Sequence, residues 1–107
     1  MADIYVAVWN QDKVAMSSVN GALIVILVIH DGLFQAQRLV MLRSGTAIFH
    51  NVPAGSYTII ARHPDLTPTE ARCDVNLAEG AILGIRFTYN EVQRQLLTVE
   101  TEVSSLP

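Results

Sequence analysis

Short apolar runs separated by turn residues recur along almost the whole chain, and this recurrence restricts the fold more than any other feature. Residues 69–77 (TEARCDVNL) alternate apolar and polar side chains, and residues 56–63 (SYTIIARH) carry Tyr57, Ile59 and Ala61 on one face. A period of two is typical of a half-buried β-strand. No stretch has a sustained helical stripe; the best helix candidate, residues 90–97, runs into β-branched residues.

The runs follow one another at about 8–12 residues, with Gly, Pro, Asn and Asp between them, which is typical of an all-β sandwich or barrel. We therefore expect an all-β, antiparallel β-sandwich of about seven to eight strands. It forms a single domain over residues 1–103, and residues 104–107 form a frayed tail. The expected strands are residues 3–9, 22–30, 38–43, 46–52, 56–63, 69–77, 81–90 and 94–103.

The run ALIVILVI, residues 22–29, is apolar on both faces. Such a run suits a central strand that is covered on both sides. It is far shorter than the roughly 20 residues that a membrane-spanning helix needs, so we expect no membrane span. The following residues, DGLFQAQ (31–37), are interpreted as a turn and loop, since Asp-Gly is a strong hairpin signal.

The charge pattern argues against a nucleic-acid partner. Of the 107 residues, seven are Lys or Arg and ten are Asp or Glu, and the arginines are scattered singly. A nucleic-acid-binding domain normally carries a basic stripe.

The first ten residues lack the basic and apolar regions of a signal peptide. We therefore expect a cytoplasmic protein if the chain is native from Met1, and an extracytoplasmic one if a leader was removed.

One segment has a distinctive order of turns and strands: SGTAIFHNVPAGSYTIIARHPDL (44–66). A tight Gly turn leads into a short strand that has Phe49 near its end. A Val-Pro-x-Gly turn and a strand that contains Tyr57 follow. With the strands up to Asn90, it resembles the prealbumin-like, carboxypeptidase regulatory-like and Cna-B-type β-sandwich domains. The resemblance implies a prealbumin-like fold and an accessory module of the kind found beside peptidases and surface proteins. In physical terms, Pro53 presets a turn, Gly55 supplies an unusual φ, and the Tyr57 ring can anchor the sandwich if its hydroxyl is bonded.

The three histidines, His30, His50 and His63, are the weak candidates for a metal site. They form no chelating pair at strand spacing, and each is expected at a strand end facing water. His50 and His63 are expected on the two strands of one hairpin about the Pro53–Gly55 turn, with His63 at its far end. We therefore expect no metal and no cofactor.

Other catalytic patterns are equally weak, so we expect no catalytic residues and no enzyme. The one cysteine, Cys73, has no neighbour in sequence that would lower its pKa. No GxSxG elbow is present. An isopeptide bond of the Cna-B type would need Lys13, Asn90 and Glu70 together, but Lys13 lies in an expected turn.

Leu33 and Phe34 are the candidate partner-binding residues, because two large apolar side chains in an expected loop can form an exposed patch. The predicted function is a non-catalytic accessory or interaction module, binding a protein or peptide partner through an edge strand or loop tips. The alternative is a small metal-dependent binder or hydrolase that uses the strand-end histidines. The sequence leaves a homo-oligomer open.

Overall fold

The computed structural model describes residues 1–16, 22–29, 32–41 and 45–105, which form eight strands and no helix. This confirms the predicted all-β class. The strands are β1 (Ala2–Trp9), β2 (Ala22–Ile29), β3 (Phe34–Met41), β4 (Thr46–Val52), β5 (Gly55–Arg62), β6 (Glu70–Leu77), β7 (Ala81–Asn90) and β8 (Gln95–Ser105). No helix in this part of the chain has the length and apolar character that crossing a membrane requires.

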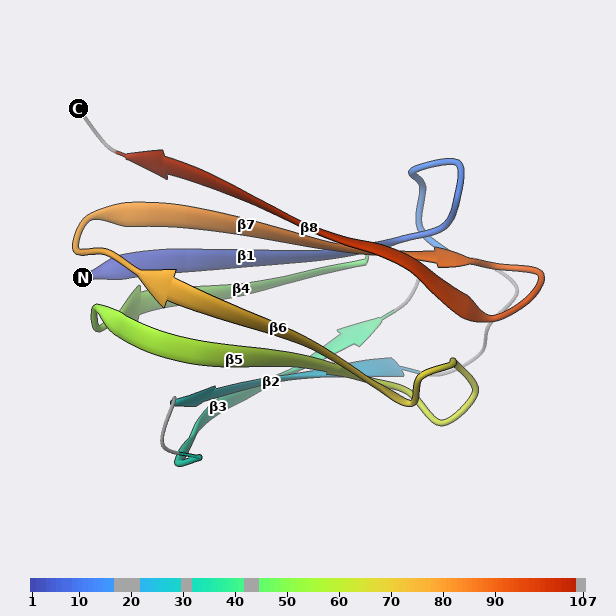
Figure 1. Cartoon of the computed structure of the whole chain (residues 1–107), viewed down its shortest axis with the longest axis horizontal. Coiled ribbons are helices and arrows are strands. Elements are labelled where there is room, and N and C mark those ends of the chain that lie inside the picture. Colours follow the sequence, from blue (N-terminus) through green and yellow to red (C-terminus); the bar gives the residue numbers. More distant parts are fainter. Residues whose placement is uncertain (17–21, 30–31, 42–44, 106–107) are drawn as a thin grey trace.

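The strands form two four-stranded sheets, ordered β4-β1-β7-β8 and β3-β2-β5-β6 (Figure 1). β1 and β7 run parallel, whereas the other five pairings are antiparallel. An immunoglobulin sandwich places its first strand beside its second, which this chain does not do. The predicted two-layer sandwich is therefore confirmed, with a strand order that differs from the immunoglobulin one.

One expected hairpin is wrong. β4 pairs with β1, and β5 pairs with β2 and β6, so the Pro53–Ala54 turn carries the chain from one sheet to the other. Gly55 has φ 152°, and the Tyr57 hydroxyl donates a hydrogen bond to the carbonyl of Pro53 at 2.6 Å. The Tyr57 ring is buried. The proposed Tyr57 anchor is thus confirmed, although it holds a crossover between the sheets.

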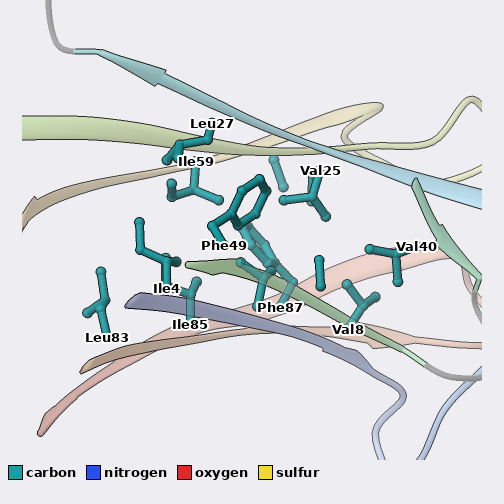
Figure 2. Packing of buried hydrophobic residues seen from close by; sticks show 14 of the residues in the cluster. Ile4, Val8, Val25, Leu27, Val40, Phe49, Ile59, Leu83, Ile85 and Phe87 are labelled. Carbon is teal, nitrogen blue, oxygen red and sulfur yellow. The ribbon is translucent and has the colours of Figure 1, made fainter. Parts of the chain in front are cut away.

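The core lies between the two sheets. In Figure 2, Phe49 and Phe87 lie at its centre, with Leu27 and Ile59 from one sheet and Ile85 from the other. The alternation of the sequence reappears as burial, since every second side chain of β7 from Ala81 to Tyr89 is buried. Each such strand places one face in the core and the other outside.

β2 lies inside its sheet, between β3 and β5, as a central strand should. Leu23, Val25 and Leu27 are buried in the core. The opposite face carries Ile24, Ile26 and Val28; Ile26 is buried and the other two are partly exposed. Among the described residues no further layer lies against this outer face, so the expectation that the strand is covered on both sides is wrong.

The structure differs from the sequence-based expectations at three places. Phe34 to Gln37 belong to β3, so Phe34 begins a strand and does not lie in a loop. The helix candidate over residues 90–97 is a turn followed by β8: the Asn90 side chain accepts the N–H of Gln93, and Arg94 has φ 60°. β8 also includes Ser104 and Ser105, which the sequence analysis assigned to the tail.

Candidate interaction site

The two described histidines, His50 and His63, do not come together. His63 lies just after β5, in the β5–β6 loop, and His50 lies near the other end of the sandwich, beside the Pro53–Ala54 turn (Figure 1). His30 lies outside the described residues. Within the described part of the chain, no three His, Cys, Asp or Glu side chains are grouped so that they could hold a metal ion.

His50 is exposed, as expected, and its ring lies beside the carboxylate of Asp3. Its Nδ1 lies 3.4 Å from a carboxylate oxygen of Asp3, whose other oxygen accepts the N–H of Asn51 at 3.1 Å. Asn51 has φ 57°, and the β1–β4 register shifts between Ala2 and Ile4. Asn suits position 51 because it is one of the few residues that readily adopt this left-handed conformation. By accepting the N–H of Asn51, Asp3 stabilises this irregular strand end.

The expectation that His63 faces water is wrong: only 2% of it is exposed. Its Nδ1 accepts the backbone N–H of Asp65 at 3.0 Å, and the backbone N–H of His63 donates to the carbonyl of Thr69. The β5–β6 loop closes the end of the core, with Leu66 buried and Thr67 hydrogen-bonded to the backbone of Leu96. A histidine can be buried here because its polar atoms have partners within the loop.

Cys73 and Lys13 also have ordinary surroundings. Burial, and then the charge of Asp74, raise the pKa of the half-buried Cys73 thiol, so a smaller fraction of it is the reactive thiolate at neutral pH. Lys13 is exposed and lines a hollow on the outer face of the β1–β7 sheet with Trp9 and Arg86. Glu70 lies on the other sheet, paired with Arg62, so the residues for an isopeptide bond are not assembled.

Leu33 and Phe34 are both exposed, and two further residues on the same edge extend their apolar surface. Leu39 and Met41 lie on β3, and the four residues have 55–63% of their area exposed. Leu39 pairs with Ile24, and Phe34 pairs with Val28. The outer face of β2 therefore extends this apolar surface from the edge toward the middle of the sheet. We call Phe34, Leu39 and Met41, with Ile24 and Val28 of β2, the β3 patch.

Leu39 and Met41 were not among the residues predicted to bind a partner, because an apolar strand residue is normally assigned to the core. The available signal was that residues 39–42 are apolar at successive positions, so that both faces of the strand are apolar, like those of β2 beside it. Which parity faces outward depends on where the strand lies in its sheet, and that is a non-local property.

The four edge strands differ in how they are protected against pairing. β6 presents Glu70, Arg72 and Asp74, and β8 presents Glu100 and Glu102. β4 is one residue shorter than β3 and β6, and Asn51, its last residue but one, has a positive φ. Charges and irregular geometry are common means of preventing edge-to-edge pairing. β3 has three large exposed apolar side chains and one charged residue, so it is the least protected edge among the described strands.

The single charge on β3, Arg38, lies on the inner side of the sheet edge. It pairs with the buried Val25, and its guanidinium carbon lies 5.2 Å from the centre of the Phe49 ring. Arg38 borders a cleft of about 150 Å³ between β3 and β4, lined also by Gln35, Ala36 and residues 49–53. Among the described residues, no carboxylate forms an ion pair with Arg38.

No protein-family model, curated protein or solved structure matches this chain. The assignment of function therefore depends on the residues and the geometry described above.

Proposed function

We propose that this chain is a non-catalytic interaction domain that binds a protein or peptide partner through β3 and the adjoining Leu33. The observation that carries the proposal is the β3 patch on an edge strand without the protective charges of β6 and β8. Patches of this kind commonly mark binding sites, and an edge strand offers unpaired backbone groups to an extended segment.

Covering a half-exposed Phe, Leu or Met side chain removes about 100 Å² from water, worth about 2–3 kcal/mol at 25 cal/mol per Å². Phe34, Leu39 and Met41 together would supply several kcal/mol before the entropic cost of association. That is enough to support a weak or transient complex, in which backbone pairing adds specificity.

The finer classification belongs to the same proposal. The Val-Pro-x-Gly crossover, its Tyr57 anchor and the eight-stranded sandwich favour a prealbumin-like domain of the carboxypeptidase regulatory-like type. Such a domain would act beside a peptidase or a surface protein, with no cofactor of its own. The alternative, a metal-dependent binder or hydrolase, has no support from His50 and His63, which lie at different ends of the fold.

Peptide display on the purified domain tests the proposal. Peptides selected on the wild type are measured against two variants, Leu39→Ser on β3 and Leu97→Ser on β8. Both leucines are exposed, so both variants should fold. We expect binding to fall at least about tenfold in Leu39→Ser, the loss of about 1.4 kcal/mol, and to stay unchanged in Leu97→Ser. If the selected peptides bind Leu39→Ser with the same affinity as the wild type, β3 is refuted as the site.

A further inference from the structure

We infer that the partner of β3 is an extended segment that alternates apolar side chains with acidic ones. This inference rests on the proposed function and names the chemistry of its partner. It depends on Arg38, a charged side chain on the inner face of β3 that would have no role if the partner bound through apolar contacts alone. A strand that adds to β3 continues the β3-β2-β5-β6 sheet, so its side chains alternate between the two faces.

On the outer face, the added strand would lie beside Leu39 and Met41, which favour apolar neighbours. On the inner face, it would lie beside Arg38 and over the cleft between β3 and β4. The guanidinium would lose water there, and no described carboxylate of this chain compensates for that loss. Asp3, beside the cleft residue His50, is already engaged by His50 and by the N–H of Asn51.

An acidic side chain directly across from Arg38 resolves this conflict, because opposite charges facing each other on adjacent strands stabilise the pair. A basic residue there would repel the guanidinium, and an apolar one would leave it with neutral contacts, the carbonyl of Gln37 and the ring of Phe49, and no carboxylate. Inward-facing charges on edge strands deter indiscriminate pairing. Arg38 would therefore act as a selectivity residue, which admits one class of strand and excludes others.

The same residue argues against a second copy of this chain as the partner. In a two-fold antiparallel β3–β3 pair, residues that face each other lie on the same face of the sheet. Centring the pair on Arg38 places the two guanidiniums directly opposite each other. Shifting the register by two residues places Arg38 opposite Ala36 or Val40 and leaves the guanidiniums as diagonal neighbours on one face. Like charges in such positions destabilise pairing.

Two synthetic peptides test the inference: Ser-Val-Glu-Val-Glu-Val-Ser and the matched peptide with both glutamates replaced by lysine. Binding to the full chain is followed by the shifts of backbone amides in NMR spectra. We expect the acidic peptide to perturb β3 and to bind about tenfold more tightly than the lysine peptide. Arg38→Glu should reverse the preference, and Arg38→Gln should abolish it. Arg38 is exposed, so both variants should fold.

Arg72→Glu on the β6 edge is the matched control, and it should leave the preference unchanged. Equal binding of the two peptides at β3 would overturn the charge selectivity while the proposed function stands. The inference also fails if neither peptide binds at β3, or if the wild type forms a β3-paired dimer in sedimentation. If no displayed peptide binds Leu39→Ser more weakly than it binds the wild type, the proposed function itself is refuted.

Discussion

Replacing Tyr57 by phenylalanine removes one oxygen atom and isolates the hydrogen bond that holds the Pro53–Ala54 crossover against β5. The hydroxyl donates to the carbonyl of Pro53 at 2.6 Å, and only 5% of Tyr57 is exposed. A hydrogen bond of this kind contributes about 0.5–1.5 kcal/mol, and water can reach the exposed Pro53 after the change. We therefore expect the free energy of unfolding to fall by about 1 kcal/mol, which lowers Tm by about 4–8 °C.

Urea denaturation is the assay, with an unchanged slope m as the sign that the fold is retained. Tyr5→Phe is the matched control, because the Tyr5 ring is more exposed and lies on the outer face of β1; its change should stay within about 0.5 kcal/mol. If Tyr57→Phe is as stable as Tyr5→Phe, then the hydroxyl does not anchor the crossover and the argument for the turn is wrong.

Three further predictions follow from local geometry. Gly55→Ala should cost about 1 kcal/mol or more in urea denaturation because φ is 152°, whereas Gly84→Ala, whose new Cβ would meet its nearest neighbour at 3.7 Å, should be neutral or stabilising; equal effects would contradict this. Burial raises the pKa of Tyr89 to about 12, so its stabilising effect is complete below pH 10 and declines by up to about 2.7 kcal/mol as the pH rises from 10 to 12; Tyr89→Phe should remove this slope. Because burial raises the pKa of Cys73, iodoacetamide should modify the folded chain more slowly at pH 8 than the urea-unfolded chain, and equal rates would refute an inert thiol.

The local elements could be predicted from the sequence because their causes are local. Alternation over residues 69–77 and 81–90 identifies β6 and β7, and the Pro-x-Gly turn identifies the end of β4. The pairing of these elements could not be predicted in the same way. β1 lies parallel to β7 at the far end of the chain, and the turn after β4 changes sheets instead of closing a hairpin. Both are choices among non-local contacts.

The candidate site shows the same division. Leu33 and Phe34 stood out because large apolar residues followed a turn signal. Leu39 did not stand out, because its exposure follows from the position of β3 at the edge of a sheet. His63 is polar and ends a strand, which favours exposure, yet the hydrogen bonds of its own loop allow it to be buried.

The central claim is that β3 is the edge to which a partner binds, and hydrogen exchange of backbone amides tests it most directly. The exchange rates of Phe34–Met41 and of Gln95–Ser105 are compared with and without a peptide selected on the domain. The account predicts that the peptide slows exchange along β3 and leaves β8 unchanged. Slowing along β8 or β6, with β3 unaffected, would contradict it.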